Sequence, residues 1–287
     1  MNFDNVMEIA GKKRAKRAAV ILAGNSKFHG AVLKANDIGL INPIFIGRDR
    51  LPYGIKDADY IYESNLEKAR TRGIEMVKEK EAEIFMDLTP IEKGLLKLID
   101  DKRIGLTGKG LISYISIFES LKDGRLTLFT DTYINDNPSL KDKVKILENA
   151  IEVADIIGIK KPKIAALAHL ELVNPTLAST TDAAVLAKMS DRRQFGAAII
   201  DGPLAMDNAE SALAARHKGI ESHVAGDVDI YLFPDIESAY LTTQFLLILG
   251  KIRHAGILRG VNIPMVTLTP LDTESSFLIN IALAVMR

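Results

Sequence analysis

Cysteine and tryptophan are both missing from this chain of 287 residues. Without cysteine there can be no disulfide, no thiolate metal site and no cysteinyl intermediate, so covalent catalysis would have to use Ser, Thr, Lys or a carboxylate. Net charge is missing as well, because 37 Lys and Arg residues balance 37 Asp and Glu residues. A neutral chain has no overall cationic field to attract polyanions. We therefore expect no nucleic-acid partner, and we interpret the basic run at residues 12–17 as a solvated segment.

Long apolar runs are also missing. The longest, Phe277–Met286, is interrupted by Asn280 and falls short of the roughly 18 residues that span a bilayer. The short apolar stretch after the basic run is preceded by Asp4 and Glu8, which is not typical of a secretory signal. We therefore expect no membrane partner and a cytoplasmic location.

The sequence does contain short runs rich in Val, Ile, Leu and Phe, alternating with longer amphipathic stretches. The short runs are residues 18–23, 43–47, 59–63, 83–87, 112–118, 126–131, 163–169, 197–201, 229–233 and 264–269. The amphipathic stretches include residues 141–157, 181–195 and 236–252. This alternation predicts an α/β fold with a mostly parallel sheet flanked by helices.

The chain length favours about two domains. There is no internal repeat, low-complexity tract or flexible linker, so the two lobes should share a close boundary. The loop at residues 131–138 is the predicted crossing point. We predict a first lobe of residues 1–132 and 255–287 and a second lobe of residues 133–254, with the return crossing resting on the resemblance described below.

Nucleotide and metal motifs are not recognisable. The glycine-dense loop Gly105–Gly110 fails as a phosphate-binding P-loop, because Arg103 and Gly110 occupy positions that need Gly and Ser or Thr. No G-x-G-x-x-G occurs, so a nicotinamide-dependent oxidoreductase is only a weak alternative. The histidines lack ligand spacing, and the carboxylates of a conceivable cation site lie in four separate segments. We therefore predict no metal; the carboxylates concerned are Asp201, Asp207, Asp227 and Asp235.

Several predicted strands end in small or polar residues just before a helix. In open α/β sheets, ligands bind beyond the carboxyl ends of the strands, where helix N-termini can bind anions. Ordinary helix capping explains any one of these sites equally well. The most informative string is the segment Asp201–Ala209. Here a predicted strand has Asp201 at its carboxyl end, Gly202 permits an unusual backbone angle, and Pro203 suits a first helical turn.

A set of motifs makes the chain resemble the phosphate acetyl/butyryltransferase family. The motifs are Asp182–Arg192, Asp201–Asp207, His217–Gly219, Val224–Asp227 and Pro234–Glu237, supported by Phe129–Asp131 and Ile281–Ala284. The resemblance implies a three-layer α/β/α architecture like that of isocitrate/isopropylmalate dehydrogenase, with two lobes, a cleft between them and usually a homodimer. It also implies transfer of a short or branched acyl group between coenzyme A and orthophosphate. Coenzyme A or acyl-CoA would be a substrate, with no tightly bound cofactor.

The resemblance and the strand-end positions together give the candidate site residues. Phosphate attacks a thioester carbonyl in this reaction, so the site must hold an anion, handle its proton and stabilise charge on the carbonyl oxygen. We predict that Asp272, Asp201 and Thr269 are catalytic, through positioning, proton handling or hydroxyl donation. The predicted substrate-binding residues are Thr107, Gly108, Lys109, Asp131, Arg192, Gly202, Pro203, Asp235, Glu237 and Thr273.

The sequence departs from the family pattern where the family has cations. Leu106 replaces an Arg, Asp87 replaces a Lys, and Pro270-Leu271 replaces a Ser-Arg pair. Charge-assisted hydrogen bonds contribute about 1.5–3 kcal/mol each, so three uncompensated losses would weaken an anion site strongly. The alternative hypothesis is therefore a family member with lost or altered catalysis that binds CoA or acyl-CoA, or acts as a regulatory protein.

Overall fold

The computed structural model describes residues 1–22, 27–48, 59–102, 104–107 and 110–287. Contacts within the chain divide it into a terminal unit, residues 2–110 and 255–287, and a central unit, Met1 and residues 111–254. The first division thus falls after Gly110, earlier than the predicted crossing at residue 132. The reason is that both strands within residues 111–132 are hydrogen-bonded into the sheet of the central unit.

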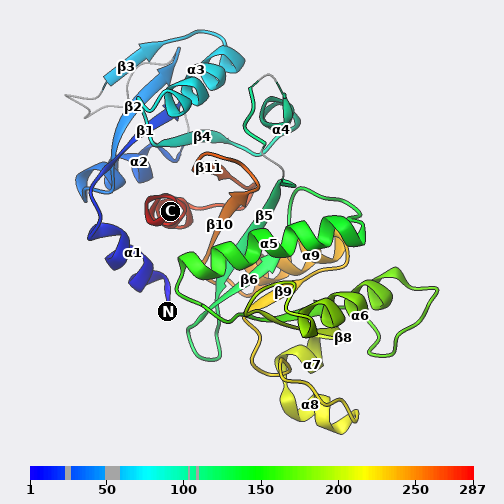
Figure 1. Ribbon diagram of the computed structural model, residues 1–287. Coiled ribbons are helices and arrows are strands. Elements are labelled where there is room, and N and C mark those ends of the chain that lie inside the picture. Colours follow the sequence, from blue (N-terminus) through cyan, green and yellow to red (C-terminus); the bar gives the residue numbers. More distant parts are fainter. Residues whose placement is uncertain (23–26, 49–58, 103, 108–109) are drawn as a thin grey trace. The chain divides into compact units, whose positions relative to one another are not determined.

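The terminal unit is built on a parallel sheet in the order β11-β4-β1-β2-β3. Its strands are β1 (Lys16–Ile21), β2 (Ile41–Gly47), β3 (Asp59–Tyr62), β4 (Ile84–Pro90) and β11 (Met265–Leu268). Its helices are α1 (Phe3–Gly11), α2 (His29–Asp37), α3 (Leu66–Lys78), α4 (Lys93–Asp100) and α10 (Glu274–Met286). Helix α3 packs on β1, and α10 packs against α1 and α2 (Figure 1).

Helix α10 forms much of the core of this unit. It begins with a capping box in which Thr273 and Ser276 bond to each other's backbone N–H groups. Nearly all of its following residues are apolar and buried. Asn280 is the polar exception, and its Oδ1 accepts the backbone N–H of Gly256 at 2.7 Å. A helix that is apolar on every side is stable only when surrounded by protein, which is the position that α10 occupies.

The central unit contains a second, mixed sheet, and hydrogen bonds order its strands β10-β5-β6-β9-β7-β8. The strands are β5 (Ser113–Glu119), β6 (Leu126–Thr130), β7 (Lys163–Leu167), β8 (Ile199–Leu204), β9 (Ile230–Leu232) and β10 (His254–Arg259), which begins at the unit boundary. The helices are α5 (Leu140–Ile156), α6 (Ala178–Asp191), α7 (Met206–Glu210), α8 (Ala212–His217), α9 (Ile236–Gln244) and the π-helical turn η1 (Phe245–Leu249). Strands β5 and β6 form an antiparallel hairpin, whereas β6, β9, β7 and β8 are parallel.

Aromatic side chains fill the core on one face of the central sheet. The ring of Phe129 lies 5.0 Å from that of Phe118 and 4.8 Å from that of Tyr231. These residues belong to one buried cluster with residues of α7 and α9. Leu128 and Ile230 alternate with them along the strands and therefore point to the other face. Helix α5 packs against β5 and β6 (Figure 1).

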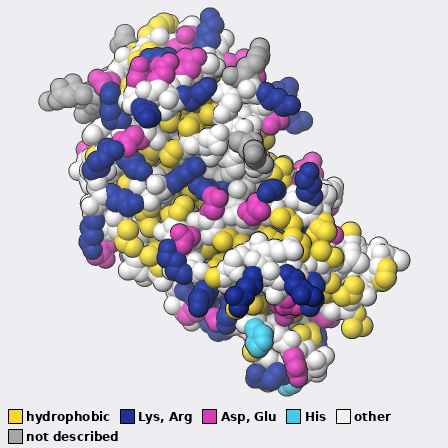
Figure 2. Space-filling model, in the orientation of Figure 1, with side chains coloured by type: hydrophobic (Ala, Val, Ile, Leu, Met, Phe, Trp, Pro, Cys, Tyr) yellow, Lys and Arg dark blue, Asp and Glu magenta, His cyan; other side chains and the backbone are white. Residues whose placement is uncertain are grey.

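The predicted α/β fold is confirmed, since each of the ten predicted runs overlaps a strand and the three amphipathic stretches overlap α5, α6 and α9. Strand β10 was missed. No helix among the described residues combines the length and apolarity needed to cross a bilayer. On the face shown in Figure 2, Lys and Arg side chains are interspersed with Asp and Glu side chains, in keeping with the balanced composition.

Candidate functional site

A buried cluster of one carboxylate and two hydroxyl groups lies at the end of β11. Asp272, only 2% exposed, accepts the N–H of Thr269 at 2.6 Å and its hydroxyl at 3.0 Å, both through Oδ2. Its Oδ1 accepts the Ser276 hydroxyl at 2.7 Å. The loop after β11 leads directly into α10, where exposed Thr273 is the N-cap. Two of the three predicted catalytic residues are therefore in contact, and Asp272 orients the hydroxyl of Thr269.

The neighbouring strand β4 carries Asp87, which is completely buried. Its Oδ2 accepts the Nε–H of Arg70 on α3 at 2.7 Å, and its Oδ1 accepts both the N–H and the hydroxyl of Thr89. Burial raises the pKa of Asp87, and Arg70 acts in the opposite direction. Helix α3 thus supplies a counter-ion to Asp87 that the strand pattern did not reveal, whereas the loss of a family cation at this position stays a prediction.

The segment before the glycine-dense loop is fixed by its backbone. The carbonyl of Leu106 accepts the N–H of Asn262 at 2.9 Å, and Thr107 forms an antiparallel bridge with Val261. The side chain of Leu106 is buried, so this position packs into the core and does not present a polar group. Gly108 and Lys109 lie outside the described residues.

In the central unit, the carboxyl ends of the parallel strands form one edge. The N–H of Phe233, after β9, donates to the carbonyl of Thr130 at 2.9 Å. Asp235 is the N-cap of α9 and accepts the N–H of Ser238 at 2.8 Å. The next residue, Ile236, donates its N–H to the carbonyl of Asp136 at 3.0 Å. The loop after β6 and the start of α9 therefore meet, and exposed Glu237 lies in the first turn of α9.

Asp131, directly after β6, holds that loop together. Its Oδ1 accepts the N–H groups of Tyr114 and Tyr133 at 3.1 and 3.0 Å, and its Oδ2 accepts the N–H and side-chain amide of Asn135. Burial raises the pKa of Asp131, while these N–H donors oppose that shift. Both carboxylate oxygens are turned into the protein. The structure thus gives Asp131 a role in loop geometry, and its contact with substrate stays a prediction.

Strand β8 continues through the most informative string. It runs from Ile199 to Leu204, so the predictions that the strand ends at Asp201 and that Pro203 opens a helix are wrong. A register shift between β7 and β8 beside this string marks a bulge, which the Gly-Pro pair accommodates. A Cβ atom on Gly202 would lie 2.6 Å from the carbonyl oxygen of Ala166, so only glycine allows this close approach. Asp201 is half-buried and accepts the N–H of Gly202.

Arg192 lies at the other end of the central sheet. It is the exposed C-cap of α6, next to Ser190, whose hydroxyl accepts the N–H of Ile200 and donates to the carbonyl of Ala198. These contacts place Arg192 beside the start of β8, because a crossover helix runs antiparallel to the strands that it connects. The structure therefore does not bring Arg192 together with Asp131 and Asp235.

Sequence reasoning missed two buried cations. Arg70 lies in the apolar stripe of α3, and its Nη2 also reaches Glu92 at 2.8 Å. Lys143 on α5 is nearly buried, and its Nζ lies 2.7 Å from Asp182 on α6, beside Pro234. The detectable signal is a basic residue inside an otherwise apolar helical stripe. Within the described ranges, no group of three or more His, Asp or Glu side chains is arranged to hold a metal ion.

Comparison with known proteins places these features in context. The family described as phosphate acetyl/butaryl transferase matches residues 60–285. A phosphate butyryltransferase from Clostridium acetobutylicum is 33% identical to the chain, over 99% of this chain and 97% of that protein. The match therefore extends through both units.

Two solved structures extend the comparison to the fold. A branched-chain phosphotransacylase from Enterococcus faecalis has a TM-score of 0.83 at 25% identity, covering 94% of this chain and 98% of that one. A 4-hydroxythreonine-4-phosphate dehydrogenase from Klebsiella pneumoniae has a TM-score of 0.52 at 12% identity, covering 95% and 100%. The second likeness concerns the fold alone, and it confirms the predicted dehydrogenase-like architecture.

Proposed function

Because the chain belongs to the phosphate acetyl/butaryl transferase family, we propose that it transfers a short or branched acyl group between coenzyme A and orthophosphate. The observation that carries the proposal is the buried contact between Asp272 and Thr269 at the end of β11, in a chain that matches the family through nearly its whole length. That contact supplies an oriented hydroxyl at the type of strand end where α/β proteins bind ligands.

The reaction defines what such a hydroxyl can do. A phosphate oxygen attacks the thioester carbonyl carbon, a new O–C bond forms, and the C–S bond breaks as the thiolate leaves and takes up the proton that phosphate gives up. Because the Thr269 hydroxyl donates its proton to Asp272, its oxygen is left as an acceptor, and in this proposal it accepts the O–H of the attacking phosphate and orients it. Asp272 bonds to Thr269 and Ser276, and it acts as a positioning residue.

The other candidate residues divide between the two units. Substrate-binding residues of the terminal unit are proposed to be Thr107, Gly108, Lys109 and Thr273. Those of the central unit are proposed to be Asp131, Arg192, Gly202, Pro203, Asp235 and Glu237, with Asp201 as the third catalytic residue. Coenzyme A and acyl-CoA enter as substrates, with no tightly bound cofactor, and the protein acts in the cytoplasm.

We also propose that the protein is a homodimer through an apolar row on α9 and η1. Leu241, Phe245, Ile248 and Leu249 are between 56% and 69% exposed. Their spacing of four, three and one residues places them on one side of the helix. Grouped apolar exposure marks association surfaces, and two-fold dimers are the commonest assembly. Light scattering should give twice the chain mass for the native protein and a monomer for Phe245→Asp, whereas a native monomer would contradict the proposal.

The transfer reaction is tested by measuring thiol release from acetyl-, butyryl- and isobutyryl-CoA with and without phosphate. We expect phosphate-dependent release and a kcat lower by about 10² in Thr269→Ala, which removes the hydroxyl that orients the attacking phosphate. Asp272→Asn should lower kcat in the same direction with a smaller effect on KM. The control is Asp59→Asn, the same chemical change at a carboxylate that is 70% exposed. No release from any of the three esters would overturn the proposal.

The alternative, a CoA-binding protein with lost or altered catalysis, makes the opposite prediction. Calorimetry would then show CoA binding to a protein that releases no thiol. The reason for this alternative is the loss of three family cations, and the ion pair with Arg70 balances the charge of Asp87 without restoring the cation.

A further inference from the structure

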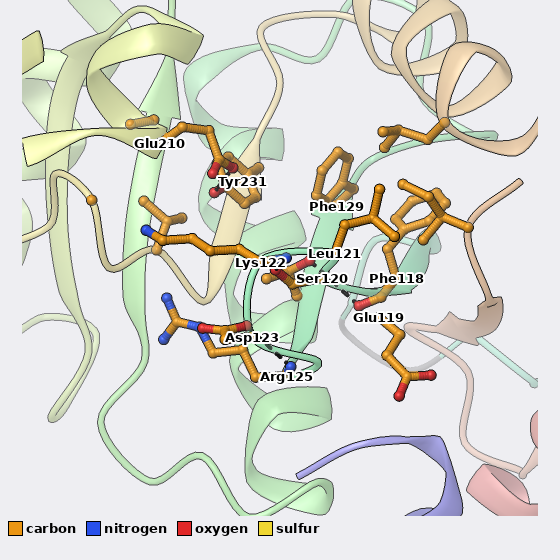
Figure 3. A pocket seen from close by; sticks show the side chains of 16 residues that line it. Phe118, Glu119, Ser120, Leu121, Lys122, Asp123, Arg125, Phe129, Glu210 and Tyr231 are labelled. Atoms are coloured by element: carbon orange, nitrogen blue, oxygen red, sulfur yellow. Dashed lines mark hydrogen bonds and ion pairs between the residues drawn. The ribbon is translucent and has the colours of Figure 1, made fainter. Parts of the chain in front are cut away.

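A cavity of about 250 Å³ opens in the central unit (Figure 3). One wall is the hairpin at residues 120–125, which joins β5 to β6. The cavity therefore lies where β6 begins, at the end of the sheet opposite to Asp131 and Asp235. Its volume is below the roughly 300–1,000 Å³ of sites for drug-sized ligands. It suits a small metabolite and is too small for a coenzyme.

Apolar side chains form the inner wall of this cavity. The ring of Phe129 packs there edge-on against Phe118 and at a tilt against Tyr231. Leu246 of η1 and Ile252 complete the wall, and both pack against the aromatic cluster. A ligand that fills the cavity would therefore place an aliphatic or aromatic group on this surface.

Most charged groups around the cavity are neutralised within the protein. Arg125 bonds to Asp123 at 3.0 Å and to Asp227 at 2.7 Å. Glu119 pairs with Arg253 at 3.0 Å. None of these groups needs a ligand to balance its charge.

Two charged side chains that line the cavity, one of each sign, differ from the ion-paired groups just described. Lys122 and Glu210 line the cavity, and neither forms an ion pair with any residue in the described part of the chain. Figure 3 shows the Lys122 side chain extending across the cavity, with Glu210 and Tyr231 above it in this view. The cavity thus offers one cation and one anion, each available to a ligand.

The anion is held in a defined orientation. The hydroxyl of Tyr231 donates a short hydrogen bond to Oε1 of Glu210, and Tyr231 is almost completely buried. Burial, and then the neighbouring Glu210, raise the pKa of Tyr231, so its hydroxyl stays a donor at neutral pH. The N–H of Ser120 donates to the carbonyl of Arg125 at 2.8 Å, and this hydrogen bond closes the hairpin that carries Lys122.

We propose that this cavity binds a small zwitterion with an apolar side chain, the chemistry of an aliphatic α-amino acid. The ligand ammonium pairs with Glu210, its carboxylate pairs with Lys122, and its side chain lies on the aromatic wall. A fatty acid would meet Lys122 but leave Glu210 facing a second anion or an apolar chain. A simple amine would leave Lys122 unpaired. The proposal does not depend on the transfer reaction.

Calorimetry on the full chain tests the ligand class with leucine and three matched probes. The probes are 4-methylpentanoate, which lacks the ammonium, 3-methylbutylamine, which lacks the carboxylate, and glycine, which lacks the side chain. Because both protein charges are exposed, we expect a leucine Kd of about 1 mM and at least about fivefold weaker binding of each probe.

Two variants test the residues. Glu210→Gln and Lys122→Met should each weaken leucine binding about five- to tenfold. Both side chains are exposed, so the substitutions should leave the fold intact. The matched controls Glu221→Gln and Lys188→Met change exposed residues that do not line the cavity and should bind leucine like the native protein. Undetectable leucine binding at about 10 mM, equal binding of a probe that lacks one charge, or native affinity in both variants would overturn the proposal.

Discussion

Two buried aspartates, Asp131 in the central unit and Asp87 in the terminal unit, solve one problem in different ways. A buried carboxylate loses its hydration and must be compensated by the protein. Asp131 is compensated by N–H groups, from Tyr114 on β5 and from residues of its own loop. Asp87 is compensated by the guanidinium of Arg70, which arrives from another element.

The hydrogen bonds of Asp131 define the backbone of a loop, whereas the ion pair of Asp87 balances a buried charge. N–H donors around Asp131 fix the path of the loop after β6, and no Lys or Arg among the described residues is recorded in an ion pair with the carboxylate. The ion pair with Arg70 balances the charge of buried Asp87, on the strand next to β11.

The largest predicted effect comes from removing the cation. Arg70→Met leaves Asp87 buried without a counter-ion and should lower the free energy of unfolding by about 3–5 kcal/mol, measured by urea denaturation. The double variant Arg70→Met/Asp87→Leu should recover most of the loss, since replacing both partners by apolar groups is often neutral.

The control for this prediction lies on the same helix. Arg72 is 39% exposed and pairs with Glu79 and Glu81 at the surface, so Arg72→Met should cost at most about 1 kcal/mol. Equal losses for Arg70→Met and Arg72→Met would show that the buried pair contributes no more than a surface pair.

The sequence was sufficient for most of the fold, because short apolar runs and helical periodicity are local signals. Strand β10 escaped detection because its short apolar core, residues 255–258, is flanked by His254 and Arg259 and contains a glycine. The path of β8 was misread because Gly202 and Pro203 usually mark turns, whereas here they accommodate a bulge between paired strands.

The candidate site was predictable where its contacts are local. Thr269 and Asp272 are three residues apart, and the strand end before α10 is enough to bring them together. The partner of Asp87 is 17 residues away, and its position depends on how α3 packs on the sheet. The position of Arg192 at the end of α6 depends on the direction of that helix, which the motif alone does not give.

A smaller effect is expected from changing the other buried aspartate. In Asp131→Asn an amide NH₂ replaces one oxygen and faces N–H groups, leaving at least one buried donor without an acceptor. The free energy of unfolding should fall by about 1–3 kcal/mol in urea denaturation. The control Asp136→Asn changes an exposed residue of the same loop and should have little effect. A larger loss for Asp131→Asn than for Arg70→Met would reverse the comparison, because the N–H cluster would then contribute more to the free energy of unfolding than the ion pair.

The smallest effect should come from an exposed carboxylate between two cations. Lys163 lowers the pKa of Asp227 most, Arg125 adds to the shift, and partial burial opposes it. A pKa below the unfolded value near 3.8 means that the pair stabilises the fold above that pH, and that this contribution is lost as the pH falls through the folded-state value.

The side chain of Asp227 is 55% exposed, so solvent screening limits the effect. At pH 7, Asp227→Asn should lower the free energy of unfolding by about 0.5–1 kcal/mol, and the gap to the native protein should close as the pH falls below about 4. The gap should also shrink in high salt, whereas the loss in Arg70→Met should persist because buried pairs are screened much less. A gap that is unchanged by both acid and salt would mean that Asp227 stabilises the fold through contacts other than its charge.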